Sequence, residues 1–263
     1  MNSFDQLAKS FAVQRRVVGA LLMREILTRY GRHNIGFLWL FIEPMMFTLG
    51  ITLLWTLTKS THGSTLPIIP FAVIGYSSVL IWRNSANRVA KAVEPNLSLL
   101  YHRNVKVIDL FAARLLLEIS GASISFVVLS AFLIATGLMD IPKDIFLMLE
   151  AWGLLAWFAI SLGLVVGAIS EMSEVFDRFW HTATYLLFPF SGSVFMVDWL
   201  PKAAQDFVLW FPMVHGVEML RHGYFGSMVK TFESPGYIIL INTIFMIIGL
   251  AMVKNVGQKV EPA

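Results

Sequence analysis

Long uninterrupted apolar stretches are the feature that most restricts how this chain can fold. About 20 apolar residues suffice for a helix to cross the hydrocarbon core of a bilayer, and the 263 residues leave room for several such segments. The chain is 57% hydrophobic and only 14% charged, whereas soluble domains are roughly 45–50% apolar and about 25% charged. A water-soluble fold could not bury this surplus. We therefore predict an all-α polytopic membrane protein.

Polar or proline-containing connections separate the apolar stretches and define the predicted span boundaries. We expect six membrane-spanning helices, at about 36–58, 66–82, 115–138, 145–169, 180–197 and 237–253. They form one transmembrane domain over 36–253, followed by a polar cytoplasmic tail over 254–263. Most of the eight tryptophans fall near the ends of these spans, where the membrane–water interface favours their amphipathic rings.

Residues 1–35 contain no apolar run long enough to cross a membrane, and no apolar core followed by a small-residue cleavage site. We therefore predict no cleaved signal peptide. An imperfect apolar stripe with helical spacing instead predicts a cytoplasmic interfacial helix, and a solvated basic tail is the alternative. The stripe comprises Phe4, Leu7, Phe11, Val18, Leu22 and Ile26, and the same region carries Arg24, Arg29, Tyr30 and Arg32.

Lysine and arginine are distributed unevenly over this span map. If both ends of the chain are cytoplasmic, the cytoplasmic segments hold 15 of the 20 lysine and arginine residues, mainly in 1–35 and 83–114. Positive residues accumulate on the cytoplasmic side of membrane proteins. We therefore predict that both termini are cytoplasmic.

The sequence lacks the motifs that would make it an enzyme on its own. It has no G-x-x-x-x-G-K-[ST] phosphate-binding loop, no H-E-x-x-H and no G-x-S-x-G motif. It has no cysteine, and its six histidines show no ligand spacing. We expect no bound cofactor, no metal and no nucleic acid. If ATP is used, a partner chain must bind it.

Glu43 and Pro44 interrupt the first predicted span. A charge at membrane depth is costly and usually faces a protein or aqueous interior, and a proline inside a helix removes a backbone hydrogen bond. We predict that Trp39, Glu43 and Pro44 lie along a transport path. A kink with a neutral, hydrogen-bonded Glu43 is the alternative. Glu118, near the cytoplasmic end of the third span, is expected close to the lipid headgroups.

The segment 198–235 is too apolar for an ordinary loop and too often interrupted for a span. Two short helices fit within it, at about 202–211 and 215–228. Irregular backbone at membrane depth is tolerated only where protein or a watery cavity covers it. We therefore predict a re-entrant outer hairpin that acts as a gate, with a surface-lying pair of helices as the alternative. Its candidate residues are Asp198, Trp199, Pro201, Pro212, His215, Glu218 and Arg221.

The connection 83–114 is too long for a simple turn, and it places apolar side chains on a basic, polar loop. Exposed apolar residues in such a place suggest a docking surface for another protein. A short helix that packs against the chain's own spans would also use them. The candidate docking residues are Glu94, Pro95, Asn96, Leu99, Leu100 and Tyr101.

Three stretches resemble the ABC-2 type exporter permeases, and among them most nearly the capsular polysaccharide export permeases of Gram-negative bacteria. They are LLMREILTRYGRHNIGFLWLFIEPMM (21–46), FSGSVFMVDWLP (190–201) and FPMVHGVEMLRHGYFG (211–226). The first is shared broadly with O-antigen and teichoic acid permeases, and the other two are narrower. The resemblance extends over essentially the whole chain.

The resemblance implies a homodimer in which each protomer engages one separate ATPase subunit that binds ATP and Mg²⁺. It further implies a channel for a lipid-linked polysaccharide, and periplasmic adaptor and outer-membrane export proteins that complete the path. By the same resemblance, the N-terminal helix and the 83–114 connection transmit ATPase motion, and the 198–235 hairpin forms the outer gate.

Two other functions remain open at this point. One is a permease of the same superfamily for another lipid-linked polymer or a small lipophilic substrate. The other is an intramembrane enzyme that uses Glu43 and histidine as acid and base.

Overall fold

The structure is a computed structural model that describes residues 3–31, 34–58, 66–101 and 105–260. All the regular elements in these ranges are helical, as predicted. In chain order they are α1 (Ser3–Tyr30), α2 (Asn34–Thr58), α3 (Ile68–Val89), η1 (Glu94–Asn96), α4 (Leu97–Leu100), α5 (Val107–Ala135), α6 (Ile145–Met172), α7 (Glu174–Leu187), η2 (Val197–Trp199), α8 (Lys202–Val208), α9 (Pro212–Phe225), η3 (Gly226–Met228) and α10 (Pro235–Val260).

Within the described ranges, four helical segments are long and apolar enough to cross a membrane: Leu38–Thr58, Val107–Ala135, Ile145–Met172 and Pro235–Val260. They match the first, third, fourth and sixth predicted spans. The second predicted span lies in α3, whose last two turns carry Arg83, Asn84, Asn87 and Arg88 and make the helix more polar.

The fifth predicted span, 180–197, is not a single helix. Its helix, α7, begins earlier because the Ser173 side chain accepts a hydrogen bond of 3.3 Å from the backbone N–H of Phe176. Such N-capping satisfies a donor that the first helical turn leaves free. The helix ends at Leu187, shortly before Pro189. Pro189 has no backbone N–H to donate to the carbonyl four residues earlier, so the helical hydrogen bonds stop here, and the chain is not helical from there to η2.

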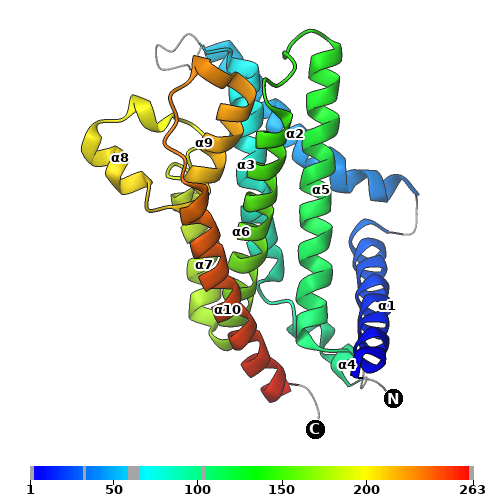
Figure 1. Cartoon of the computed structure of the whole chain (residues 1–263). Coiled ribbons are helices and arrows are strands. Elements are labelled where there is room, and N and C mark those ends of the chain that lie inside the picture. Colours follow the sequence, from blue (N-terminus) through cyan, green and yellow to red (C-terminus); the bar gives the residue numbers. More distant parts are fainter. Residues whose placement is uncertain (1–2, 32–33, 59–65, 102–104, 261–263) are drawn as a thin grey trace.

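Helix α6 lies at the centre of the bundle and packs against α3, α9 and α10, while α3 also packs against α2 and α5 (Figure 1). Of the most apolar 18-residue stretch of each helix, 61% is buried in α6, whereas only 17% is buried in α2 and 22% in α10. Helices α2 and α10 thus expose broad apolar faces, which suits contact with lipid or with another membrane chain.

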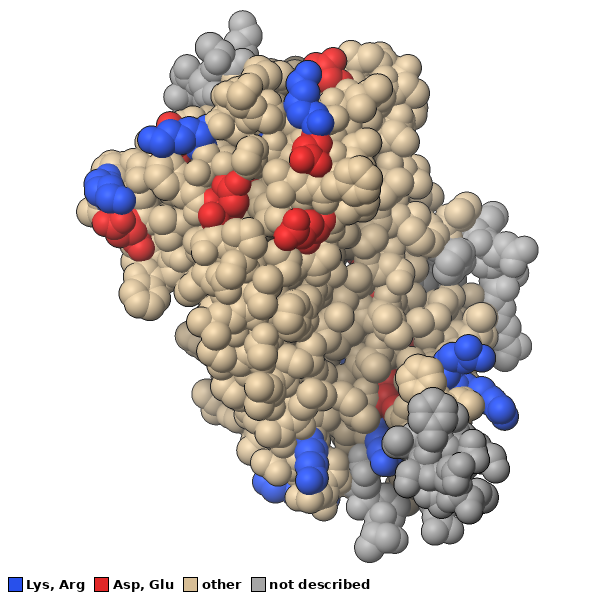
Figure 2. Space-filling model, in the orientation of Figure 1, with Lys and Arg blue, Asp and Glu red and all other residues tan. Residues whose placement is uncertain are grey.

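The two chain ends and α4 lie at one end of the bundle, and the α5–α6 connection, α8 and α9 lie at the other (Figure 1). On the face shown in Figure 2, acidic side chains gather at the α8–α9 end, and the end near the termini displays mainly lysine and arginine. This grouping agrees with the span map that placed most positive residues on the side of the termini.

Candidate functional site

Helix α1 packs against the first turns of α5, near the end of the bundle where the two chain termini lie (Figure 1). Leu21 is buried and joins a core cluster with Val89 of α3 and Phe111 of α5. Val18 and Leu22, two members of the predicted stripe, pack against this cluster. Phe11 is exposed, and the side chains of Phe4 and Leu7 fall outside the described residues. Among the described members of the stripe, Val18 and Leu22 thus dock against the bundle and Phe11 does not.

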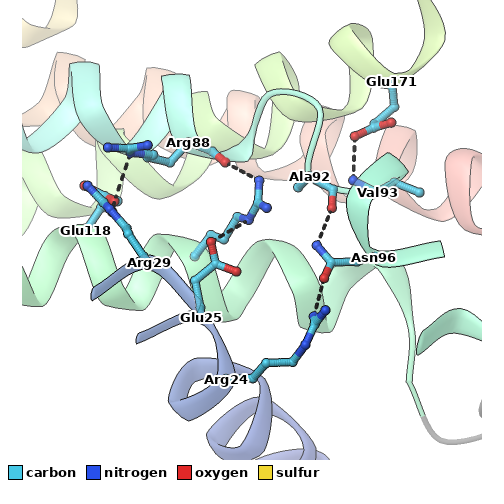
Figure 3. Close-up of polar contacts among 10 residues, drawn as sticks. Arg24, Glu25, Arg29, Arg88, Ala92, Val93, Asn96, Glu118 and Glu171 are labelled. Atoms are coloured by element: carbon cyan, nitrogen blue, oxygen red, sulfur yellow. Dashed lines mark hydrogen bonds and ion pairs between the residues drawn. The ribbon is translucent and has the colours of Figure 1, made fainter. Parts of the chain in front are cut away.

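Polar contacts join α1, α3 and α5 at a polar junction whose centre is Glu118 (Figure 3). The Glu118 carboxylate accepts a hydrogen bond from Nη1 of Arg29 in α1, and the Nε atom of Arg88 in α3 lies 3.4 Å from the same oxygen. Only 7% of the Glu118 side chain is exposed. Glu118 is thus enclosed by protein, with Arg29 of α1 and Arg88 of α3 beside it, and its position near the headgroups stays a prediction.

Arg29 also approaches Glu43, since its Nη2 atom lies 3.9 Å from Oε2 of that carboxylate. Arg29, Glu43 and Glu118 border a cavity of about 10 Å³, which is near the smallest volume that holds a water molecule. The predicted site residues Arg29 and Glu43 are thereby brought together, although nothing in their sequence spacing identified them as partners.

Further contacts hold α1 in register along α5. Oε1 of Glu25 lies 3.2 Å from Nε of Arg114, whose Nη1 atom donates to the Arg88 carbonyl at 2.8 Å. Gln14 donates to Asp109, and the other oxygen of Asp109 accepts from the backbone N–H of Lys106 at 2.9 Å. Asp109 thus caps the start of α5 and at the same time binds α1.

The segment that connects α3 to α4 is held between α1 and α6. Asn96 accepts a hydrogen bond from Arg24 and donates one of 2.8 Å to the Ala92 carbonyl. On the other side, the backbone N–H of Val93 donates to Glu171 of α6 at 2.7 Å (Figure 3). Of the predicted α1 residues, Arg24 and Arg29 take part in these contacts, whereas Arg32 and the side chain of Tyr30 fall outside the described residues.

The predicted docking residues separate into exposed and buried groups. Tyr101 is 78% exposed, and Leu97, four residues earlier, is also exposed, as are Glu94 and Pro95. Leu100 is only 2% exposed and Asn96 is buried, because both face the protein interior, and Leu99 is partly buried. The candidate docking surface, which stays a prediction, is thus reduced to the exposed residues Glu94, Pro95, Leu97 and Tyr101.

The outward face of α2 carries the other predicted transport residues. Trp39, Glu43, Met46 and Phe47 recur at helical spacing and line an open groove of about 380 Å³. Pro44 points elsewhere, toward α3 and α5. Near it, the Ser125 hydroxyl of α5 donates to the Phe41 carbonyl at 2.7 Å, so α5 covers the backbone next to the proline.

Two short helices occupy the segment 198–235, as predicted, with Pro201 before the first turn of α8 and Pro212 in the first turn of α9. The buried Arg221 of α9 donates to the carbonyl oxygens of Gly192, Ser193 and Phe195. Its guanidinium carbon lies 3.8 Å from the centre of the Phe71 ring, close enough for a cation–π contact. Arg221 thereby satisfies backbone oxygens that the non-helical segment 188–196 leaves without helical partners.

Glu218, one turn before Arg221, holds two other stretches of backbone. Its carboxylate accepts from the backbone N–H groups of Val197 and Phe232, each at 3.3 Å. Burial raises the pKa of Glu218 to about 7, against the opposing effects of Arg221 and the two donors. Residues Glu218 and Arg221 thus join α9 to both flanking loops.

The remaining predicted hairpin residues lie at its edges. The imidazole of His215 lies 2.9 Å from the Leu209 carbonyl through Nε2 and accepts from the backbone N–H of Ser234 at 3.1 Å through Nδ1. Burial lowers the pKa of His215, in keeping with a neutral ring. Trp199 stacks on Phe71 at 5.3 Å, and Asp198 lies 3.3 Å from Lys230.

Sequence reasoning missed several participants, namely Gln14, Glu25, Arg88, Asp109, Arg114 and Glu171. It singled out Glu118 but did not identify its partners. The available signal was weak: Glu25 and Arg29 lie one turn apart on α1, and Arg114 and Glu118 lie one turn apart on α5. Facing i,i+4 pairs of opposite sign can pair across two helices as well as within one.

Comparison of the sequence with known proteins identifies the family of this chain. Residues 16–225 match the ABC-2 type transporter family. The chain is 51% identical over 254 residues to the capsule polysaccharide export inner-membrane protein CtrC of Neisseria meningitidis, with 97% of this chain and 96% of that protein covered. It is 48% identical over the same coverage to BexB of Haemophilus influenzae, which bears the same description.

A third relative is more distant. The polysialic acid transport protein KpsM of Escherichia coli is 30% identical over 248 residues, with 93% of this chain and 95% of that protein covered. The match extends over nearly the full length of all three relatives, so it includes α1, the polar junction and the α8–α9 segment alike. The chain therefore belongs to the ABC-2 type transporter family, in the group that contains the capsule polysaccharide export inner-membrane proteins.

Proposed function

We propose that this chain is the inner-membrane permease subunit of an ABC exporter that moves a lipid-linked capsular polysaccharide from the cytoplasm to the periplasm. The observation that carries the proposal is the 51% identity over 97% of the chain to a relative named for capsule polysaccharide export. The apolar helices suit a membrane protein. The sequence lacks a phosphate-binding loop, which assigns ATP and Mg²⁺ to a separate ATPase subunit.

The proposed topology has six spans, with α3 and α7 as the second and fifth, and with both termini in the cytoplasm. Helix α3 is 22 residues long and most of it is buried by other helices, which lets a moderately polar helix sit at membrane depth. Helix α7 has only 14 residues, so the non-helical stretch after it completes the crossing under the cover of α9. In this topology α1 lies at the cytoplasmic interface, and α8 and α9 form a re-entrant hairpin that serves as the outer gate.

The proposed partners follow from the surfaces that the fold leaves open. Glu94, Pro95, Leu97 and Tyr101 form the docking surface for the ATPase, one subunit for each protomer. The α2 groove with Trp39 and Glu43 faces a second copy of the chain, and the homodimer encloses the polysaccharide path. Periplasmic adaptor and outer-membrane export proteins receive the polysaccharide beyond the outer gate, and membrane lipids surround the apolar helices.

An intramembrane enzyme is the less favoured function. That hypothesis needs Glu43 and a histidine close together as acid and base. Glu43 instead lies beside Arg29, while His215 and His222 belong to α9, at the opposite end of the bundle from the chain termini (Figure 1).

Deleting the gene in its own host tests the function. We expect surface capsule to disappear and polysaccharide to accumulate inside the cell, with export restored by a plasmid copy of the wild-type gene. A plasmid copy should fail to restore export when the ATPase gene is also deleted. Normal surface capsule in the deletion strain would overturn the proposal.

The topology can be tested separately because the natural chain has no cysteine. Trp210 and Tyr101 are both exposed and lie on either side of the proposed membrane. A cysteine at position 210 should react with a membrane-impermeant maleimide added to spheroplasts, and one at position 101 should react only after lysis. The reverse pattern would contradict the proposed orientation.

A further inference from the structure

One guanidinium group at the polar junction lies between two carboxylates from different helices. Arg29 of α1 donates through Nη1 to Glu118 of α5, and its Nη2 atom lies 3.9 Å from Glu43 of α2. The first contact is a hydrogen-bonded ion pair, and the second is at the outer limit of one. A small rotation of the Arg29 head would reverse this order, and all three side chains border the same cavity of about 10 Å³.

Glu118 and Glu43 differ in the cations and the solvent contact that remain when Arg29 moves away. Glu118 is nearly buried and retains Arg88, whose Nε atom lies 3.4 Å away. The Glu43 side chain is 40% exposed, and within the described residues Arg29 is the cation found within 4 Å of it. A buried ion pair is costly to break when it leaves a buried charge without compensation. Neither position of Arg29 leaves such a charge.

The two cations on Glu118 come from the two elements that flank the docking surface. Arg88 lies in the last turn of α3, which leads directly into the 90–101 segment. Arg29 lies in the last turn of α1, which Arg24 attaches to Asn96 in the same segment. A displacement of this segment would therefore reach Glu118 along two helices at once.

Above the ion pair, α2 and α5 are in close contact beside Pro44. A β-carbon on Gly121 would lie 2.9 Å from the Leu40 side chain and 3.3 Å from the Leu40 carbonyl oxygen. Pro44 has no N–H to donate to that carbonyl, which lies four residues earlier. Ser125 adds its hydrogen bond to the Phe41 carbonyl. The lower part of α2 is thus attached to α5 by packing, and to α1 by the charge on Glu43.

We propose that Arg29, Glu43 and Glu118 couple the ATPase to the transport path: Arg29 exchanges between Glu118 and Glu43 when the docking surface moves, and this exchange shifts the α2 face that carries Trp39 and Glu43. The inference rests on the proposed export function. It assigns a positioning role in export to Glu118 and Arg29, and a second role to Glu43 beyond lining the path.

The test compares ATP hydrolysis with export for single variants. Permease variants are co-expressed with the ATPase in the deletion strain, capsular sugar is measured at the cell surface and inside the cell, and ATPase activity is measured on the purified complex. We expect Arg29→Gln, Glu43→Gln and Glu118→Gln to keep complex assembly and ATP hydrolysis within about twofold of wild type. Export should fall about tenfold, inside the 5- to 150-fold range typical of coupling between sites.

Arg178→Gln is the matched control. Arg178 pairs with Glu174 at 3.7 Å, and both side chains are largely exposed, so export should stay at the wild-type level. Loss of export in proportion to lost complex or lost hydrolysis would overturn the inference, since a purely structural ion pair predicts that result. Wild-type export in Glu43→Gln would overturn it too, because a fixed pair between Arg29 and Glu118 does not need Glu43.

A double variant separates coupling from direct contact between Glu43 and the polysaccharide. If Arg29 and Glu43 act through each other, the variant with both Arg29→Gln and Glu43→Gln should export no less than the weaker of the two single variants. Multiplied losses would indicate independent roles and contradict the exchange. If instead the wild-type protein neither exports capsule nor assembles with the ATPase, the proposed function itself fails. That outcome is seen without any variant, so it is distinct from a failure of the exchange.

Discussion

Gly75 of α3 lies directly against the backbone of Ser193, so that a β-carbon at Gly75 would be only 2.3 Å from the Ser193 carbonyl oxygen. The same oxygen accepts a hydrogen bond of 2.6 Å from Nη2 of Arg221. The non-helical segment 188–196 is thus confined between a glycine on α3 and an arginine on α9. This contact explains how irregular backbone can be buried beside α9.

Gly75→Ala should lower the stability of the purified permease because the added methyl group meets a fixed carbonyl rather than a mobile side chain. Overpacking of this kind costs about 1–3 kcal/mol, which corresponds to an apparent Tm lower by roughly 2–10 °C for a chain of this size. Thermal unfolding in detergent, followed by size-exclusion fluorescence, measures the change. Gly153→Ala on α6 is the control, since a β-carbon there meets nothing within 4 Å, and equal Tm values for both variants would refute the close contact.

Arg221→Met should reduce the yield of folded, monodisperse protein severely. The change leaves three carbonyl oxygens without their donor and the buried Glu218 without its neighbouring cation. A buried polar group left without its hydrogen-bond partner costs about 1–3 kcal/mol, and here three carbonyl oxygens lose their donor. Adding Glu218→Gln to the same chain should recover part of the yield, because it removes the uncompensated charge. Lys202→Met, which breaks an exposed pair with Asp206, should have little effect, and a double variant as poor as Arg221→Met would argue against the charge explanation.

Stability should depend on pH through Glu218. Because burial raises its pKa to about 7 in the folded chain, the folded state holds this proton after the unfolded state has lost it. The contribution of Glu218 is therefore fully present below its unfolded pKa, and it is lost as the pH rises through about 7. His215 acts in the opposite sense, since burial lowers its pKa and its contribution is lost as the pH falls.

Comparing wild type with Glu218→Gln isolates the carboxyl group from His215. The glutamine keeps a neutral side chain at every pH. The Tm of Glu218→Gln relative to wild type should therefore rise from about pH 5, just above the pKa of an ordinary glutamate in the unfolded chain, to about 7, the pKa of Glu218 in the folded chain. The measurement is a series of unfolding curves in matched buffers. A Tm difference that stays constant across the series would show that Glu218 does not titrate in this range.

Tyr101→Glu should weaken binding of the ATPase. Tyr101 is 78% exposed beside the exposed Leu97, and loss of a central aromatic contact typically costs about 2 kcal/mol, or roughly 30-fold in Kd. Co-purification of tagged ATPase with the permease, or titration of one against the other in nanodiscs, gives the value. Met228→Asp, at an exposed site near the outer hairpin, should bind normally. Undiminished binding of Tyr101→Glu would remove this surface as the dock.

The burial of Leu100 and Asn96 changes how the docking segment must be probed. Both residues were predicted to meet the ATPase, yet both are turned inward because α4 is a short helix whose inner side packs under α3 and α5. A charged substitution at Leu100 would therefore report on folding rather than on docking. The sequence shows that apolar residues gather here, but the side of the helix that each one occupies depends on how α4 rests against the bundle.

Helix α7 shows the same division between local and tertiary information. Its start at Ser173 and its end before Pro189 were both readable from capping and proline preferences, but the apolar run through 180–197 suggested one continuous span. The non-helical segment 188–196 is possible because Arg221 donates hydrogen bonds to its carbonyl oxygens. Gly75 leaves space for the same backbone because it has no β-carbon. Neither residue is near this run in the sequence.

The sequence by itself determined that this chain is an all-helical protein with membrane-length apolar segments, that positive charge gathers toward the side of the termini, and that it carries no phosphate-binding loop of its own. Those properties follow from segment length, composition and local motif, which need no knowledge of packing. Only the tertiary structure decided which charges meet. Arg29 and Glu118 are 89 residues apart, and the rotation of each helix about its axis, set by the packing of α1, α3 and α5, brings them together.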